Sequence, residues 1–599
     1  MQGSFLSIKS RNTRLVLLFS ILLGLTVVLV AALPPTSSAT QGNAQSDRGQ
    51  KPARPRFVPG QALVRYRSER LAKQRTTEKL LSSDGRQLSI QIEPFDGADI
   101  VPGLRLARVA PEDTMAAIAA LKAQPDVLYA EPNYLLHLDA NPNDPRFLSN
   151  ELYGLLKIGA PQAWDTIKGS SDSPQAGFGS PRIVVGVIDE GIDVLHQDLA
   201  ANIWTNPGEG ATADGIDNDL NGFVDDIHGY DFALNSGVIT PQSHGTHVAG
   251  TIGAVGNNAT GVVGVNWGVG LMSLKFIDGF QADTADAIRA CNYAKMMRDL
   301  WVSSGGSQGA NLRVLNNSYG DDQFTQSFLD SINALNQSGI LFVASAGNVD
   351  GFSTQPDNDL VAHYPSGYAA PNVIGVASTG QTDDLAADSH YGAATVHLGA
   401  PGVGILSTTP GNTYSFLSGT SMATPHVAGA AALLLAQNQN LTIQQLKGLL
   451  IYNGDLVSSL AGKTQTGRRL NVANSVAASA ENDVTAPGTV GNLHLNSQTG
   501  RSMNVGWTAS GDDGASGQAS LYALSFTDAS SGAVIFLKNL IPAASGVVQA
   551  VDVEIPYRHP VGTLNLREFD NAGNEGVPAT LPISVSLIAE IGRVAGTPS

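Results

Sequence analysis

The sequence predicts an α/β fold with a doubly wound, mostly parallel sheet, preceded by a small α+β unit and followed by an all-β sandwich. Three observations lead to this prediction. Short apolar runs alternate with helical patterns over residues 183–436, which is typical of parallel sheets covered by helices. A short strand-and-helix pattern precedes this region, and strand-like runs between Gly, Asp and Ser turns follow it.

The first unit occupies residues 56–137, after a linker at 40–55 that is rich in Gln, Ser, Pro and Arg. Periodicity predicts strands at Gln61–Tyr66, Leu104–Val109 and Val127–Tyr134, and helices at Arg70–Leu81 and Met115–Ala123.

The central unit is expected over residues 138–478. Its predicted strands are Ile183–Ile188, Met272–Phe276, Leu312–Asn316, Ile340–Ala344 and Val373–Ala377. Its predicted helices are Thr246–Ala254, Thr284–Leu300, Phe324–Asn336 and Ser421–Ala436. Ligands of such sheets bind outside the carboxyl ends of the strands. Asp189 ends one strand, Asn348 follows another, and His244 and Ser421 begin helices, so we expect these four side chains to meet at one edge.

A linker at residues 479–489 leads to the last unit, residues 490–599. Strands are predicted at Met503–Trp507, Leu521–Thr527, Val534–Leu537, Val547–Ile555 and Thr563–Glu568.

The N-terminus carries three basic residues, an apolar run from Leu15 to Leu33, and small residues before Thr40. This pattern predicts a secretory signal over residues 1–39. The run is nearly long enough to span a bilayer, so an uncleaved membrane anchor stays open as an alternative. We expect a secreted protein, extracellular or associated with the periplasm or cell envelope.

The charge distribution limits the kinds of binding partner that we expect. Residues 1–110 hold 16 Lys and Arg against 7 Asp and Glu, whereas the rest of the chain holds 19 against 45. The acidic body argues against nucleic acid as a partner and is compatible with bound cations.

Cys291 is the one cysteine, so no intramolecular disulfide forms. Its helical, Ala-rich surroundings predict a small buried side chain rather than a reactive thiol.

Three strings place an acid, a base and a hydroxyl in one chain: VIDEG at 187–191, SHGTHVAG at 243–250 and GTSMATP at 419–425. A serine hydroxyl becomes a nucleophile when a positioned base removes its proton. Taken alone, a Ser before helical sequence, such as Ser421, more commonly caps the helix. His247 lies three residues after His244 without the HExxH spacing of zinc sites, so we expect a packed structural histidine.

These strings, in the order Asp, His, Ser, resemble the subtilisin-like serine proteases, or subtilases. The resemblance implies that Ser421 is the nucleophile, that His244 is the general base and then acid, and that Asp189 orients its imidazole. The string ASAGN at 344–348 resembles the oxyanion-hole segment of the family, with Asn348 and the Ser421 backbone N–H as donors. Glu190 replaces the usual Thr or Ser, and we expect its charge to raise the pKa of His244.

The resemblance also implies where substrate binds. The string NSYG at 317–320 matches a family segment beside which the substrate adds as a strand. The expected substrate-binding residues are Ser318, Tyr319, Gly320, Ser345, Ala346 and Gly347. Tyr319 stands where the family usually has Leu, and we expect it to narrow or reshape a side-chain pocket. The small residues at 345–347 favour large apolar substrate side chains.

Calcium is the expected cofactor. The string DNDLNGFVDD at 217–226 places oxygen ligands at alternate positions around a turn glycine, as in the first part of an EF-hand, although His228 occupies the twelfth position. The expected ligands are Asp217, Asp219, Asn221, Phe223 and Asp225. A second site, implied by the resemblance, contains Asp198 and Asn258. A solvated acidic turn is the alternative for the first site.

The sequence therefore predicts a serine endopeptidase that hydrolyses protein and peptide substrates through an acyl-enzyme. The string DVLYAEPNY at 126–134 resembles the end of the subtilase inhibitory propeptide, which implies an intramolecular inhibitor removed by autoprocessing. The last unit resembles a fibronectin type III domain in its Trp507 strand, Tyr522 and residues 567–574. A peptide ligase or macrocyclase using the same triad, and an extracellular binding protein with an inactive protease scaffold, stay open as alternatives.

Overall fold

The computed structural model describes residues 57–67, 76–82, 85–94, 101–134, 141–173, 175–210, 212–279, 282–349, 354–481, 483–514, 517–532, 534–555 and 561–585. The predicted secretory signal and first linker lie outside these ranges. Within them, no helix is long and apolar enough to cross a membrane.

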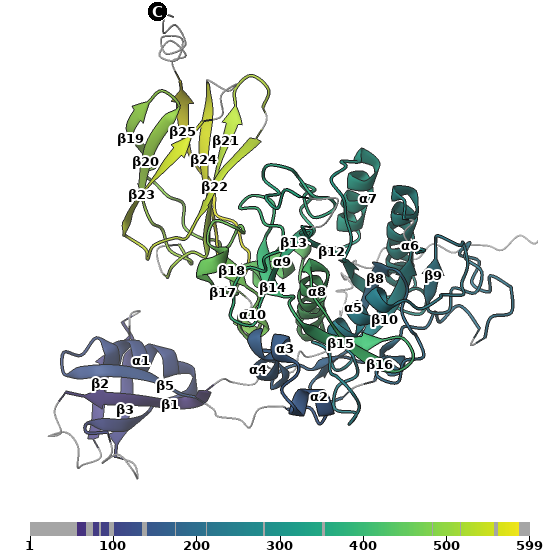
Figure 1. Ribbon diagram of the computed structural model, residues 1–599. Coiled ribbons are helices and arrows are strands. Elements are labelled where there is room, and N and C mark those ends of the chain that lie inside the picture. Colours follow the sequence, from purple (N-terminus) through teal and green to yellow (C-terminus); the bar gives the residue numbers. More distant parts are fainter. Residues whose placement is uncertain are drawn as a thin grey trace, which may run out of the picture. The chain divides into compact units, whose positions relative to one another are not determined.

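Residues 57–134 form an antiparallel five-stranded sheet in the order β2-β3-β4-β1-β5 (Figure 1). Its elements are β1 (Phe57–Tyr66), β2 (Thr76–Leu81), β3 (Gln87–Glu93), β4 (Leu104–Arg108), α1 (Thr114–Lys122) and β5 (Val127–Tyr134). Side chains of α1, including Ile118 and Leu121, are buried with Val64 and Ile90 of the sheet. Three predicted strands and one predicted helix of this unit are confirmed.

The helix predicted over Arg70–Leu81 is wrong in its described part. Residues 76–81 form β2, which pairs with β3, a strand that the sequence analysis missed. Short apolar patterns do not separate helix from strand. Pairing with β3 and the β-branched Thr76 and Thr77 favour the strand here.

The central part contains a nine-stranded sheet in the order β17-β18-β14-β13-β12-β11-β8-β10-β9. The strands are β8 (Val184–Asp189), β9 (Gly229–Asp231), β10 (Gly270–Lys275), β11 (Leu312–Asn317), β12 (Leu341–Ser345), β13 (Val373–Thr379), β14 (Leu398–Pro401), β17 (Asp455–Leu456) and β18 (Arg468–Arg469). All neighbouring pairs are parallel except β17 with β18. The strand order reverses beside β8, since β10 pairs with one of its edges and β11 with the other.

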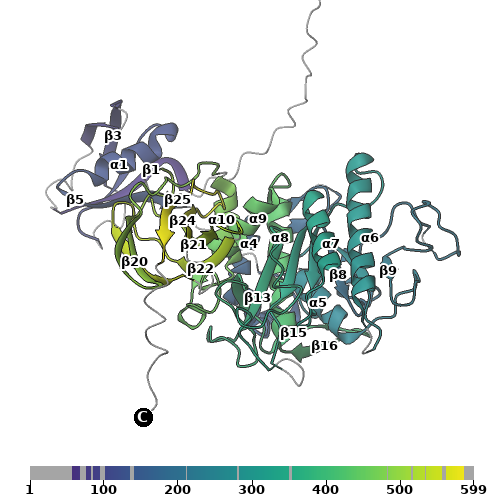
Figure 2. The ribbon, with the colours of Figure 1, turned by 90° about the horizontal axis from the view of Figure 1, so that it is seen from above.

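Helices cover both faces of this sheet. The long helices are α5 (Ser243–Gly253), α6 (Thr284–Ser303), α7 (Gln326–Gln337), α8 (Thr420–Gln437), α9 (Ile443–Tyr452) and α10 (Val472–Glu481). The helices α6 and α7 lie side by side in both views (Figures 1 and 2) and bury apolar residues with one set of strand side chains. The other set packs against α5, α8 and α9. The doubly wound sheet is therefore confirmed.

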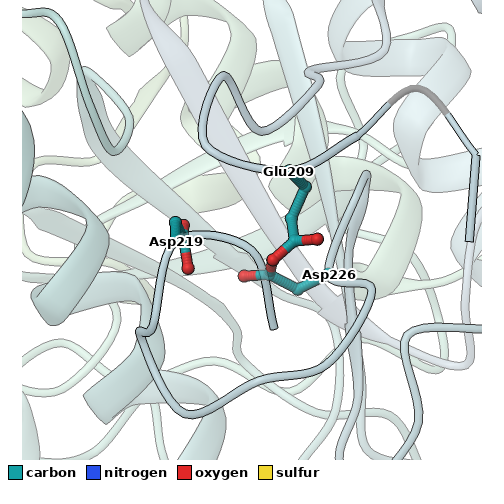
Figure 3. A group of neighbouring side chains, drawn as sticks. All are labelled: Glu209, Asp219 and Asp226. Atoms are coloured by element: carbon teal, nitrogen blue, oxygen red, sulfur yellow. The ribbon is translucent and has the colours of Figure 1, made fainter. Parts of the chain in front are cut away.

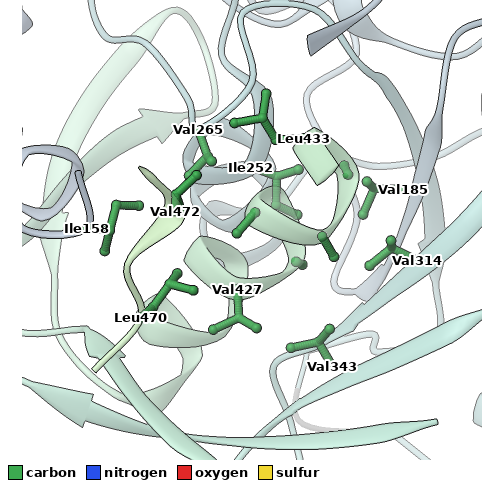
Figure 4. Close-up of a cluster of buried hydrophobic side chains, with 14 of the residues drawn as sticks. Ile158, Val185, Ile252, Val265, Val314, Val343, Val427, Leu433, Leu470 and Val472 are labelled. Atoms are coloured by element: carbon green, nitrogen blue, oxygen red, sulfur yellow. The ribbon is translucent and has the colours of Figure 1, made fainter. Parts of the chain in front are cut away.

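The core around α8 explains why this helix is apolar on all sides. Val427 and Leu433 of α8 are fully buried, together with Val185, Val314 and Val343 of three neighbouring strands (Figure 4). A helix that is apolar all round belongs in a protein interior. Because α8 is packed against the strands in this way, its first residues, including Ser421, have a fixed position relative to the sheet.

Smaller elements complete the central part. They are α2 (Pro145–Leu148), α3 (Tyr153–Lys157), α4 (Ala160–Trp164), β6 (Gly169–Ser170), β7 (Phe178–Gly179) and the hairpin of β15 (Ile405–Thr409) with β16 (Thr413–Leu417). Helix α10 ends at Glu481, so it continues past the expected start of the linker at residue 479.

Two further antiparallel sheets follow, β19-β20-β23 and β22-β21-β24-β25. Their strands are β19 (His494–Thr499), β20 (Ser502–Thr508), β21 (Leu521–Asp528), β22 (Val534–Leu540), β23 (Val548–Glu554), β24 (Val561–Phe569) and β25 (Ala579–Ser584). Buried side chains from both sheets, among them Trp507 and Phe526, form one cluster. The five predicted strands are confirmed, and β19 and β25 were missed.

Candidate active site

The expected side chains lie at the carboxyl edge of the central sheet, beside the point where strand order reverses. Asp189 is the last residue of β8. Its neighbour Ile188 pairs with Asn317, the last residue of β11, so Ser318 follows directly beside it. This is the edge at which ligands of doubly wound sheets bind.

Asp189 and His244 form a direct pair. Nδ1 of His244 lies 2.8 Å from Oδ1 and 3.0 Å from Oδ2 of Asp189. Asp189 is 1% exposed, and Oδ1 also accepts the backbone N–H of Glu190 at 2.7 Å. Burial acts to lower the pKa of His244, but attraction to Asp189 and, to a smaller extent, Glu190 outweighs it and raises this pKa. The expected direction of the Glu190 effect is confirmed.

Ser421 is the second residue of α8 and faces the end of β11. Its Oγ donates to the carbonyl oxygen of Ser318 at 3.1 Å, and Oγ of Ser318 donates back to the carbonyl oxygen of Ser421 at 2.9 Å. Gly419, just before the helix, has φ of +143°, a conformation that L side chains rarely adopt. Glycine therefore allows the sharp entry that presents Ser421 at the helix N-terminus.

Asn348 contacts Thr420, the residue directly before Ser421. Its Oδ1 accepts the backbone N–H of Thr420 at 2.9 Å and the Thr420 hydroxyl at 3.2 Å. Because Oδ1 accepts these hydrogen bonds, the Nδ2 group of the same amide can donate to a different acceptor. The site thus contains two series of contacts. One joins His244 to Asp189 at the end of β8. The other begins at Ser318 after β11 and continues through Ser421 and Thr420 to Asn348.

The expected substrate-binding segments end two strands that are neighbours. Ser318, Tyr319 and Gly320 follow β11, and Ser345 ends β12, followed by Ala346 and Gly347. The expected effect of Tyr319 on a side-chain pocket stays a prediction. The Tyr319 ring packs on Phe276 at 4.5 Å between centroids, and its hydroxyl donates to Oδ1 of Asn317 at 3.1 Å, so this partly buried side chain packs against the core beneath the segment.

Sequence reasoning missed two residues at this site, His363 and His390. Both imidazoles are buried, and both lie against the glycines of the substrate-binding segments. Each histidine is distant in sequence from the glycine it contacts, so no local pattern pointed to either.

The acidic loop brings together a different set of carboxylates from the one expected. Glu209, Asp219 and Asp226 each place an oxygen within 4.8 Å of the other two (Figure 3). Asp226 is fully buried, which raises its pKa, and it accepts Tyr293 Oη at 2.6 Å. Among the described residues no Lys or Arg forms an ion pair with any of the three.

Of the expected ligands, Asp219 belongs to this carboxylate group, and the complete expected ligand set stays a prediction. Asp217 instead accepts backbone N–H groups of residues 221 and 222, and Asp225 accepts those of residues 214 and 215. Asn221 donates Nδ2 to Asp219 and Asp226. Phe223 packs edge-on against Tyr230 and Tyr293 and anchors the loop. Alternate spacing did not reveal Glu209, which precedes the loop.

The second expected cation site is also a cluster of buried oxygens. Asp198 accepts Nδ2 of Asn258 at 2.8 Å and the backbone N–H of Val262 at 2.8 Å, and burial raises its pKa to about 6. Asp144, which the sequence analysis did not include, accepts the backbone N–H of Asn257 at 2.7 Å, and burial raises its pKa.

Two expected structural residues are confirmed. Nε2 of His247 contacts the carbonyl oxygens of Ile405 and Ser415, and burial lowers the pKa of His247 to about 4. Cys291 is 1% exposed, and burial raises the pKa of its thiol to about 12, as expected for a small buried side chain.

The chain is similar to known proteins in two regions. Residues 180–466 match the model of the subtilase family, and residues 43–133 match that of the fervidolysin N-terminal prodomain. Thermophilic serine proteinase of Bacillus sp. (strain AK1) is 36% identical over 330 residues, 54% of this chain and 67% of that protein. Thermitase of Thermoactinomyces vulgaris is 35% identical over 302 residues, 50% of this chain and 87% of that protein.

Subtilisin-like protease 1 of Plasmodium falciparum is 36% identical over 307 residues, 48% of this chain and 43% of that protein. The chain therefore spans less than half the length of this relative.

Proposed function

The chain belongs to the subtilase family of serine-type endopeptidases, and from that premise we propose that Asp189, His244 and Ser421 are its catalytic triad. The observation that carries the proposal is the 2.8 Å contact between His244 and Asp189 at the sheet edge that also holds Ser421. Asn348 and the backbone N–H of Ser421 form the oxyanion hole.

In this mechanism Ser421 Oγ leaves its hydrogen bond to Ser318 and gives its proton to Nε2 of His244 as it attacks the peptide carbonyl. Asp189 keeps the proton on Nδ1, which fixes the tautomer and stabilises the imidazolium. Nδ2 of Asn348 and the helix N-terminus stabilise the oxyanion. His244 then protonates the leaving amine, and water hydrolyses the acyl-enzyme by the same steps.

The substrate binds as a strand beside Ser318–Gly320, where backbone groups are available for pairing. The prodomain acts as the intramolecular inhibitor, and the enzyme removes it by autoprocessing, supported by the match of residues 43–133 to a prodomain. We propose secretion as well, supported by the basic and apolar pattern of residues 1–39. The C-terminal sheets form a fibronectin type III-like sandwich, supported by their shared core.

Calcium is the proposed structural cofactor, and the donor sets fit it because they consist of oxygens alone. Glu209, Asp219 and Asp226 would hold one ion, and Asp198 and Asn258 would contribute to another. A bound ion supplies positive charge that offsets the mutual repulsion and burial of these carboxylates. Its role is to stabilise the fold, since neither cluster includes a residue of the triad.

Expression of the full chain with calcium tests the proposal. We expect the wild type to cut itself and the Ser421→Ala variant to remain full-length. Ser418→Ala is the matched control, because the Ser418 side chain is exposed and accepts only the N–H of Gly404 among the contacts of the described residues. A Ser421→Ala variant that matures at the wild-type position would overturn the assignment.

A further inference from the structure

Two imidazoles from different loops meet between the substrate-binding segments. His363 lies in the loop between β12 and β13, and His390 lies in the loop between β13 and β14. Their ring centroids are 5.5 Å apart and the rings are nearly perpendicular, at 79°. His363 is 6% exposed and His390 is 1% exposed, so both rings are held inside the protein.

His363 is tied to the segment that follows β11. The backbone N–H of Asp321 donates to the carbonyl oxygen of Tyr364 at 2.9 Å, and the N–H of Tyr364 donates back to Asp321 at 2.7 Å. This bridge sets His363 beside Gly320. A Cβ on Gly320 would collide with Cε1 of the His363 ring, so the ring lies directly against that glycine.

His390 is tied to the segment that follows β12. Its backbone N–H donates to the carbonyl oxygen of Gly347 at 2.9 Å, and its Nδ1 contacts Oδ1 of Asn358 at 3.1 Å. Asn358 in turn donates Nδ2 to the carbonyl oxygen of Ala346 at 2.8 Å. A Cβ on Gly347 would lie 2.8 Å from Nδ1 of His390 and 2.8 Å from Cδ2 of His363.

The absence of a side chain at Gly320 and Gly347 thus lets the two imidazoles lie directly against both substrate-binding segments. We infer that His363 and His390 close the floor of the pocket for the substrate side chain that precedes the scissile bond. Substrates with a short side chain there, Ala or Ser, are therefore preferred over those with Phe or Leu. This inference rests on the proposed function, and it reverses the preference that the small residues 345–347 predicted.

Packing explains why the floor does not simply retreat. Protein interiors are close-packed, and a buried ring moves only if its neighbours move. His390 is held by its own backbone and by Asn358, and the neighbour of His363 is held by the bridge to Asp321. A large apolar substrate side chain would therefore have to displace the His363 ring. His363→Gly would remove this ring and open the space that it fills.

The test uses the matured protein and peptides that differ only in the residue before the scissile bond, Ala, Ser, Leu or Phe. For the wild type we expect kcat/KM to be at least about tenfold higher for Ala than for Phe, a ratio within the range that pocket size controls. His363→Gly should raise kcat/KM for Phe by at least about tenfold and change that for Ala by less than about threefold. His494→Gly, an exposed histidine outside the central part, is the matched control and should leave the profile unchanged.

A second measurement needs no variant. Peptidyl diphenyl phosphonates ending in the Ala or the Phe analogue should label wild-type Ser421 with the same preference for the short side chain. A wild type that prefers Phe or Leu overturns the inference while leaving the proposed function intact. A protein that cleaves none of the peptides and is not labelled at Ser421 overturns the proposed function, and this inference with it.

Discussion

Nδ1 of His244 lies 2.8 Å from Oδ1 of Asp189, a carboxylate that is buried at the end of β8. The same oxygen accepts the N–H of Glu190, so Asp189 is fixed from two sides and in turn fixes the imidazole. Asp189→Asn keeps the shape but favours the wrong tautomer of His244. We predict a fall in kcat of about 10⁴ with little change in KM, measured on a peptide substrate. A loss below about tenfold would contradict the role of Asp189.

The pH dependence follows from the raised pKa of His244. A general base must be neutral, so kcat/KM is lost as the pH falls through this pKa in the free enzyme. Glu190 contributes to raising it. Glu190→Gln should therefore move the acidic limb of the pH–rate profile to lower pH. Glu151→Gln, at a carboxylate paired with Arg146 away from the site, is the control, and coincident profiles for all three proteins would exclude the Glu190 effect.

Asn348→Ala removes one proposed oxyanion donor. We predict a fall in kcat of about 10²–10³, the cost found when this kind of donor is removed from a subtilisin. The oxyanion forms only during reaction, so KM should stay within about threefold of the wild type. Because Asn348 also accepts from Thr420, a purely structural role would instead lower the melting temperature, which differential scanning fluorimetry measures on the same samples.

Calcium should stabilise the protein through Asp226. An ion present at a hundred times its Kd contributes about 2.7 kcal/mol to the free energy of unfolding. We predict that calcium raises the Tm of the wild type and that Asp226→Asn reduces this rise. Asp330→Asn, at an exposed carboxylate on α7, should keep the full rise. An Asp226→Asn variant with the wild-type response would remove this cluster as a calcium site.

The sequence predicted the central unit well because its strands are buried on both faces and its helices are long, so both patterns are strong. The same patterns predicted which side chains would meet at one sheet edge, because each lies near a strand end or a helix start: Asp189, His244, Asn348 and Ser421. Weaker patterns failed. The six residues of β19 are all exposed and show no alternation. Strand β25 contains Pro582, which argues against a strand unless it lies at a sheet edge, as β25 does.

Contacts between distant segments could not be predicted. Glu209 joins Asp219 and Asp226 only because the loop folds back. His363 and His390 reach Gly320 and Gly347 through backbone bridges between loops far apart in the chain. Spacing along the sequence carries no information on such approaches, and for this reason the carboxylate group and the contacts of the two histidines needed the structure.

The most direct test of the central claim is the site at which a fluorophosphonate modifies the matured protein. Intact mass spectrometry and peptide mapping measure both stoichiometry and position. We predict one adduct per chain, on Ser421, and a rate of modification that falls by at least about a thousandfold in His244→Ala. An adduct on another serine, or an undiminished rate in His244→Ala, would contradict the assignment of Ser421 as a nucleophile activated by His244.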